Sequence, residues 1–267
     1  MKKLAHLYLV LVMLFLYVPI FVLIVFSFNE TKSRSVFSGF TLDWYERLFH
    51  NEIIISSLVN TIIIAVLTSI ISTILGTLAA IGINSMRKVP KAVVMNITNM
   101  PIINPEIVTG VSLMLLFVFF AARMNLEFGF VTLLLAHITF DVPYVILNIM
   151  PKFKQMDPHL YEAAQDLGCS PFQAFKKVIL PEIMPGIVSG FLIAFTYSLD
   201  DFVISYFTSG STSQTLPITI YSMTRRKISP EINALSTLIF LVVVIVLIVK
   251  HLIETRTAKK NGTYKGA

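Results

Sequence analysis

The chain has 267 residues, of which 55% are hydrophobic and 13% are charged, whereas about 25% of the residues of an average soluble domain are charged. This composition excludes an ordinary soluble protein and points to a lipid bilayer. The net charge of +6 does not require nucleic acid as a partner, because the lysines and arginines that orient a membrane protein produce the same balance. The single cysteine, Cys169, excludes an internal disulfide and a thiolate metal site.

The apolar segments predict an all-α integral membrane protein with six transmembrane helices. Long stretches without a charged residue, such as 53–86 and 202–224, match or approach the roughly 20 residues that cross a hydrocarbon core. The first segment is too long for a signal peptide and no cleavage site follows it, so we expect a retained helix. The predicted spans are residues 7–28, 58–86, 92–120, 130–150, 186–207 and 233–251.

The third predicted span contains two prolines and an acid. Pro101 and Pro105 each lack a backbone donor and disfavour helix in the preceding residue, so a kink or unwound turn is expected over 100–106, which includes Glu106. Such irregular backbone requires protein rather than lipid around it. Both a packing kink and a break that lines a substrate path fit this pattern.

Basic residues orient the predicted spans. With both termini in the cytoplasm, the inside segments hold most of the 21 lysines and arginines, as the positive-inside rule requires. The cluster that begins at Arg225 runs against this orientation. The basic residues placed outside are Lys32, Arg34, Arg47, Arg123, Arg225, Arg226 and Lys227. No repeat or linker divides the sequence, so we expect one membrane domain over residues 1–267.

The segment between the fourth and fifth spans has the signals of two short helices. Asp157 is suited to cap a helix that starts at Pro158, and Gly168 is suited to end it in the left-handed conformation. The smooth surface of Ala163 and Ala164 suits docking into a groove of a partner, although a plain connector remains the alternative.

The second short helix is expected over 171–178. Ser170 and Gln173 form the pattern of a capping box, with Pro171 at the first helical position. The helix is expected to end before Pro181, because a proline ring is costly in a helix interior.

This segment resembles the EAA loop of bacterial ABC-importer permeases. The resemblance rests on Glu162-Ala163-Ala164, then Gly168 after three residues, then Val178-Ile179-Leu180-Pro181 after nine more, with valine where the family usually has isoleucine. It implies a cytoplasmic coupling loop of about residues 152–182 that seats on an ATP-binding subunit. The residues implied in coupling are Glu162, Ala163, Ala164, Gly168, Pro171, Leu180 and Pro181.

No G-x-x-x-x-G-K-[ST] phosphate loop occurs in the sequence. ATP and its magnesium are therefore expected on a partner ATPase, and no cofactor is expected on this chain. We expect a transport subunit rather than an enzyme.

Four carboxylates fall within predicted spans that hold no lysine or arginine in their interiors: Glu106, Asp141, Asp200 and Asp201. Ionisable groups at this depth are costly and mark functional sites, so four acids predict a cationic passenger. At about 1.5 Å rise per residue, Asp200 is expected in the outer half and Asp141 nearer the midplane, and Glu106 is expected in the outer half if the break is ignored. The alternatives are protonated acids, capping by Ser198 or Thr139, and an interfacial position.

Two further features bear on the substrate site. Neighbouring helical residues point about 100° apart, so one of Asp200 and Asp201 is expected to bind the passenger while the other anchors the helix. Trp44 offers an aromatic face to an alkylammonium group, although Trp and Tyr also form interfacial belts. The predicted substrate-binding residues are Asp200, Asp201, Glu106, Trp44, Ser198 and Asp141.

Over nearly its full length the chain resembles PotC-type permease subunits of spermidine/putrescine importers. The resemblance includes Leu16-Tyr17-Val18-Pro19-Ile20, Ser27-Phe28-Asn29, Trp44-Tyr45 and Ser198-Leu199-Asp200-Asp201-Phe202. It implies a type I importer fold in a bacterial inner membrane. The implied partners are a second permease subunit in a heterodimer, a homodimeric ATP-binding subunit and an extracytoplasmic substrate-binding protein.

Three other functions compete with polyamine import. The first is an ABC permease for another solute, such as iron or a phosphonate, because these permeases share the EAA loop. The second is an intramembrane aspartyl protease built on Asp141 and Asp200, which the missing G-x-G-D sequence disfavours. The third is a membrane scaffold, which would tolerate loss of the membrane carboxylates.

Overall fold

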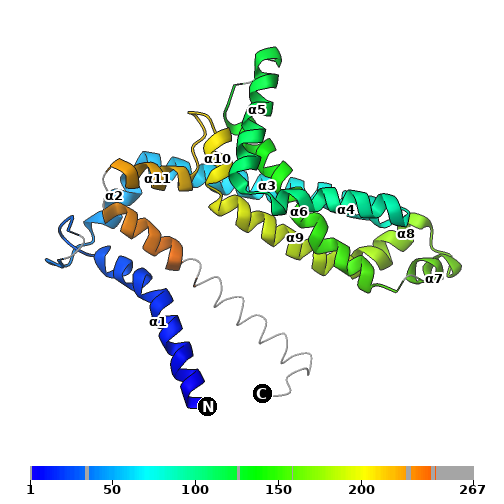
Figure 1. Ribbon diagram of the computed structural model, residues 1–267, viewed down its shortest axis with the longest axis horizontal. Coiled ribbons are helices and arrows are strands. Elements are labelled where there is room, and N and C mark those ends of the chain that lie inside the picture. The colour runs from blue at the N-terminus through cyan, green and yellow to red at the C-terminus, as the bar shows by residue number, and fades with distance from the viewer. Residues whose placement is uncertain are drawn as a thin grey trace. The chain divides into compact units, whose positions relative to one another are not determined.

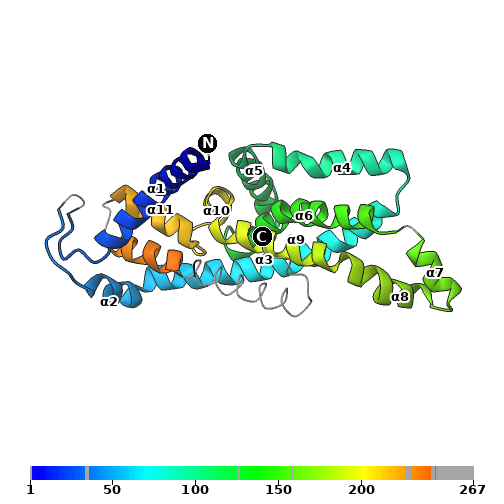
Figure 2. The same cartoon turned by 90° about the horizontal axis from the view of Figure 1, so that it is seen from below.

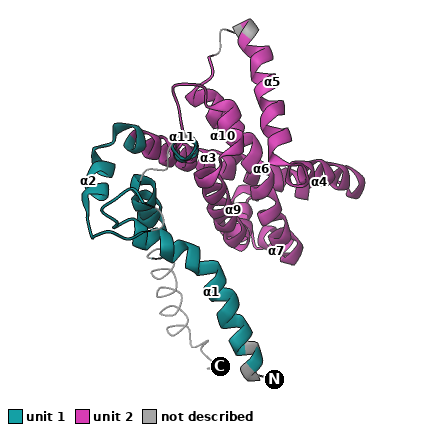
Figure 3. Ribbon diagram, turned by 60° about the vertical axis from the view of Figure 1, so that its left-hand side comes forward, with its two compact units in different colours: residues 1–55, 220–267 teal, residues 56–219 magenta. Residues whose placement is uncertain are grey.

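The computed structural model describes residues 2–33, 36–124, 127–157, 159–226, 230–241 and 244. Within these residues the regular structure is helical, apart from one isolated antiparallel bridge between Asn29 and Phe40. Among the described helices, four are long and apolar enough to cross a membrane, and a bent pair makes a fifth candidate. The all-α prediction is confirmed. Contacts divide the chain into two compact units, residues 1–55 with 220–267 and residues 56–219 (Figure 3).

The first unit contains α1 (Lys2–Phe26), α2 (Asp43–His50) and an apolar helix over Pro230–Leu241. The predicted first span is confirmed as a helix, and it continues through Pro19. The helix Pro230–Leu241 covers the start of the predicted sixth span, whose residues 245–251 lie outside the described residues.

Asn29 organises the loop between α1 and α2. Its side-chain amide donates to the carbonyl oxygens of Ser33 and Val36, and its side-chain oxygen accepts from the backbone of Ser38 at 2.9 Å. The backbone oxygen of Asn29 accepts from the indole of Trp44 at 2.7 Å. The loop is therefore built around a fully buried amide whose donors and acceptor are all used.

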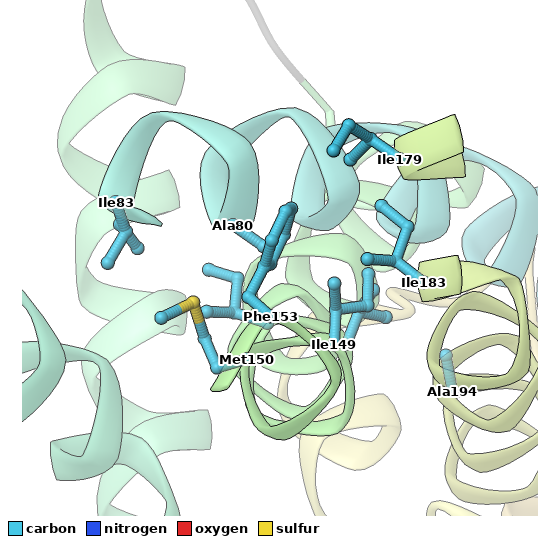
Figure 4. Packing of buried hydrophobic residues seen from close by; sticks show 10 residues of the cluster. Ala80, Ile83, Ile149, Met150, Phe153, Ile179, Ile183 and Ala194 are labelled. Carbon is cyan, nitrogen blue, oxygen red and sulfur yellow. The ribbon is translucent and has the colours of Figure 1, made fainter. Parts of the chain in front are cut away.

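The second unit is centred on α6 (Phe130–Gln155), which packs against α9 (Leu180–Asp200). The two helices run side by side in Figures 1 and 2. Apolar side chains from α3 (Glu52–Asn84) complete the core, and Figure 4 shows this cluster around Ile149 and Ile183. α6 begins at the predicted residue and remains helical through Pro143.

Two glycines allow the close approach of α9 to α6. A Cβ atom at Gly186 would lie 2.9 Å from the backbone oxygen of Asn148 and 3.1 Å from the Cα of Ile149. A Cβ atom at Gly190 would lie 3.2 Å from the Cα of Val145. Small residues spaced four apart are a common device by which membrane helices bring their backbones together.

The third predicted span is broken, as expected. α4 (Lys88–Ile103) and α5 (Glu106–Met124) meet at an angle of 104°. Asn104, which precedes Pro105, has extended backbone, as a residue before proline prefers. The depth estimate for Glu106 ignored this break and does not apply to the bent chain, which changes direction just before this residue.

The first helix of the coupling loop is α7 (Leu160–Asp166). The backbone N–H of His159 donates to the Asp157 carboxylate at 2.9 Å, whereas the predicted first residue, Pro158, lies outside the described residues. Gly168 ends the helix with a φ of +84°, which confirms the predicted left-handed turn. The backbone N–H of Gly168 bonds to Gln165 and that of Cys169 to Ala164, which makes a Schellman motif.

The second helix of the coupling loop starts as predicted and ends differently. Ser170 and Gln173 form both bonds of the capping box at the start of α8 (Pro171–Ala174). The prediction that the helix stops before Pro181 is wrong, because the chain passes through a π-helical segment, Phe175–Ile179, into α9. Pro181 follows the π-helical segment directly, so the irregular turn lies where the missing N–H and the ring of the proline would otherwise disrupt an α-helix.

The fifth predicted span, 186–207, is not one continuous helix. α9 ends at Asp200, and α10 (Val203–Thr208) begins after the two residues Asp201 and Phe202. α10 packs against α5 and α6, and α11 (Leu216–Arg226) follows it in the chain. In Figure 2, α7 and α8 lie at one end of α6 and α9, and α10 lies toward the other.

We predict that Gly186→Ala separates α6 from α9. The new methyl group has backbone on the opposite helix as its neighbour, so a cost of about 1–3 kcal/mol is expected. The measurement is the Tm of the purified protein in detergent. Gly82→Ala is the matched control, since a Cβ there meets nothing within 4 Å. Equal Tm values for the two variants would contradict the prediction.

Candidate functional site

Four polar side chains meet where α9 breaks, and we name His137, Ser198, Asp201 and Ser205 the His137 cluster. The Nδ1 atom of His137 lies 2.7 Å from the Ser198 hydroxyl, and its Nε2 atom lies 2.9 Å from the Ser205 hydroxyl. Nε2 also lies 3.4 Å from a carboxylate oxygen of Asp201. The cluster is buried and joins α6 to both α9 and α10.

Asp201 caps α10 rather than extending α9. Its backbone is extended, and its two carboxylate oxygens accept from the backbone N–H groups of Ile204 at 3.2 Å and Ser205 at 2.7 Å. A carboxylate is favourable at this end of a helix because the first N–H groups have no helical partner. The expectation that Asp200 and Asp201 are neighbours on one helix is therefore wrong.

Ser198 belongs to the same cluster, and its hydroxyl bonds to a histidine rather than to one of the membrane carboxylates. Its hydroxyl, on a residue that is 3% exposed, bonds to His137. Thr139, the other proposed capping residue, donates instead to the backbone oxygen of Leu135 one turn earlier.

Sequence reasoning missed His137. The signal available was an ionisable residue inside an apolar span, four residues before Asp141 and therefore on the same face of α6. The partner of His137 is 64 positions later in the chain, at a break that helical periodicity does not indicate.

Asp141 is 1% exposed, and neither of its carboxylate oxygens has a hydrogen-bond partner among the described residues. Buried polar groups without a partner are rare and call for an explanation. A bound cation, or a group from a partner subunit, would satisfy this carboxylate.

Asp200 and Glu106 are exposed, in contrast to Asp141. Tyr197 lies one turn before Asp200 on α9, and its ring meets that of Tyr144 edge-on at 4.6 Å between centroids. Tyr144 also interacts electrostatically with Glu106 and Asp141. The second unit thus combines two exposed acids with the exposed ring of Tyr197 and the half-buried ring of Tyr144.

The geometry suits binding of a cation. Carboxylates replace the water around an ammonium group, and aromatic faces attract it through cation–π contact. Among the described residues no group of three or more His, Cys, Asp and Glu side chains is arranged to hold a metal ion.

Trp44 belongs to the first unit, whereas these acids belong to the second. Its ring is 5% exposed, and the guanidinium of Arg47 lies 5.1 Å from the ring centroid. A cationic side chain of the protein itself, that of Arg47, therefore already lies over this indole.

The coupling-loop residues form a surface that is mostly open. Ala164 is buried and Leu180 is half-buried, whereas the others are exposed: Glu162, Ala163, Gly168, Pro171 and Pro181. Two large apolar side chains stand out beside them, with Leu167 87% and Phe172 73% exposed. Exposed apolar groups gathered on one surface are typical of a docking site.

The chain has clear relatives among known transport proteins. The family described as "Binding-protein-dependent transport system inner membrane component" matches residues 72–258. The chain is 35% identical to the spermidine/putrescine transport system permease protein PotC of Shigella flexneri, across 92% of this chain and 91% of that protein. It is 38% identical to the putrescine transport system permease protein PotI of Escherichia coli K12, across 91% and 88%.

A solved structure shares the fold. A bacterial ABC transporter involved in the import of the acidic polysaccharide alginate has a chain that aligns with a TM-score of 0.69 and 15% identity, covering 95% of both chains. The matched family, the named relatives and the apolar helices make the protein a multi-pass permease of the bacterial inner membrane. The chain therefore belongs to the family of inner membrane components of binding-protein-dependent transport systems.

Proposed function

We propose that this chain is a permease subunit of an ATP-driven importer that takes up polyamines such as spermidine and putrescine. The relatives named above support this substrate class. The observation that carries it is the set of acids in the second unit, two of which are exposed and lie near the paired rings of Tyr197 and Tyr144. The apolar stretches of the helices that carry these acids contain no lysine or arginine among the described residues.

A polyamine is matched by this arrangement because its charges are separated by methylene chains. Asp200 and Glu106 would pair with ammonium groups, and the rings of Tyr144 and Tyr197 would cover the charge and the adjoining methylenes. Asp141 lies deeper and would receive a charge on the way inward. Each contact is weak enough by itself to permit release.

The complete importer would contain four kinds of chain. This subunit forms a heterodimer with a second permease, and a homodimeric ATPase binds ATP and magnesium on the cytoplasmic side. An extracytoplasmic binding protein delivers the passenger. The chain itself is a single membrane domain with six spans and cytoplasmic termini, and it carries no cofactor.

The coupling loop, residues 152–182, would dock in a groove of the ATPase. The Schellman turn at Gly168 fixes the angle between α7 and α8, and helix continues from Pro171 to Asp200. Closure of the ATPase would therefore move the acid-bearing end of α9 together with the docked end, which produces alternating access.

The substrate is tested by uptake into proteoliposomes that hold the four-component importer. Radiolabelled spermidine is expected to accumulate when ATP and the loaded binding protein are present, and a hundredfold excess of unlabelled spermidine is expected to compete. Ferric iron and phosphonate are the comparison solutes. Uptake of one of these without competition by spermidine would contradict polyamine import and leave the permease role intact.

We predict that Gly168→Val abolishes most transport and leaves membrane insertion intact. A β-branched residue at a φ of +84° is strained by about 1–2 kcal/mol, and no neighbour of the new side chain adds a clash. Gly168→Asn is the matched control, because asparagine tolerates this conformation. The readout is uptake per inserted permease. Normal uptake by the valine variant would remove the coupling role of this turn.

We predict that Asp200→Asn and Glu106→Gln each lower the spermidine taken up per ATP hydrolysed by about tenfold. Hydrogen bonds to charged groups contribute about 1.5–3 kcal/mol, and each variant removes the charge while keeping the shape. Glu127→Gln, which neutralises an exposed acid in the loop between α5 and α6, is the control. An unchanged ratio in both variants would show that these acids do not meet the passenger.

A further inference from the structure

Asp200 and Asp201 are adjacent in the chain but have opposite surroundings. Asp200 is the last residue of α9 and is exposed. The side chain of Asp201 is 7% exposed and faces into the His137 cluster. One sequence motif therefore contains one carboxylate open to a ligand and one that is enclosed.

Both carboxylate oxygens of Asp201 already face donors of the chain itself. One oxygen accepts from the Ile204 backbone, and the other accepts from the Ser205 backbone at 2.7 Å and faces Nε2 of His137 at 3.4 Å. A passenger ammonium group at this carboxylate would compete with the bonds that start α10. Displacing those bonds would leave backbone donors unpaired in a buried place, which is costly.

His137 is also fully engaged. With the proton on Nε2, the ring donates toward Asp201 and Ser205, and Nδ1 accepts from the Ser198 hydroxyl at 2.7 Å. Ser198 lies before the break in the helix and Ser205 lies after it. The imidazole therefore bridges the two sides of the break from a third helix, α6.

We propose, on the basis of the function proposed above, that His137 is a positioning residue for Asp200. It holds Asp201 as the cap of α10, which fixes the break between α9 and α10 and with it the direction of the Asp200 carboxylate. Asp200 then contacts the polyamine and Asp201 does not. Asp200 therefore binds the passenger, and Asp201 anchors the start of α10.

A double-mutant cycle tests this assignment in the reconstituted importer. The readout is spermidine transported per ATP hydrolysed, because a loss of folded protein lowers both rates and leaves their ratio unchanged. His137→Ala is expected to lower the ratio about fivefold in the otherwise unmutated permease. In the Asp200→Asn background the same change is expected to lower it less than twofold, since the positioned group is already lost.

Two variants and one control sharpen the cycle. Asp201→Asn is expected to behave as His137→Ala does, and His137→Gln is expected to recover most of the lost ratio because its amide still donates to Asp201. Thr139→Ala removes a hydroxyl two residues away that bonds only within α6, and no change is expected.

Two results would overturn the assignment. In the first, the loss of ratio caused by His137→Ala, or by Asp201→Asn, multiplies with the loss caused by Asp200→Asn. The changes would then act independently, which would mean that the buried acid meets the passenger itself. An unchanged ratio in His137→Ala, with uptake and ATP hydrolysis falling together, would mean that the imidazole only supports folding.

Failure of polyamine import is recognised separately, because the unmutated importer is measured first. If the unmutated importer takes up no polyamine, the proposed function is contradicted. Thermal unfolding then tests whether His137 holds Asp201 as the cap of α10. His137→Ala, Asp201→Asn and the double variant are expected to share one lowered Tm if the two residues form one network. Additive Tm shifts would overturn the network.

Discussion

The close approach of α9 to α6 at Gly186 and Gly190 is the contact on which the rest of the second unit depends. Both glycines face backbone atoms of α6, so no larger residue fits without moving the helices apart. α6 carries His137 and Asp141 on one side of this contact and Lys152 on the other. α9 runs from the coupling loop to Asp200. One interface thus sets the acids and the docking surface at fixed positions on the same pair of helices.

Local signals in the sequence were sufficient for the parts of the fold that depend on a few neighbouring residues. The turn at Gly168 and the capping box of Ser170 and Gln173 are stabilised by bonds within five residues, so the spacing of residue types predicts them. The break before Glu106 follows from Pro105 in the same way. The family resemblance extended these local features to a permease fold.

The features that sequence reasoning missed depend on partners far along the chain. A proline is expected to end a helix, but at Pro181 the π-helical segment Phe175–Ile179 absorbs the irregularity and helix continues. The end of α9 at Asp200 is likewise determined by the His137 cluster, in which Asp201 bonds across α6 and α10. Burial of Asp141 depends on the packing of other helices against α6, which hydropathy alone does not reveal.

The π-helical segment also links chain length to angular phase. A π turn closes over one more residue than an α turn, and one residue of an α-helix corresponds to about 100° of rotation. Deleting a single residue between Phe175 and Ile179 would therefore restore regular α-helix without turning the helix beyond it, whereas regular α-helix with all five residues kept would turn everything beyond it by about that angle relative to the docked end. The azimuth of Asp200 around α9 therefore depends on a segment that lies some twenty positions earlier in the chain.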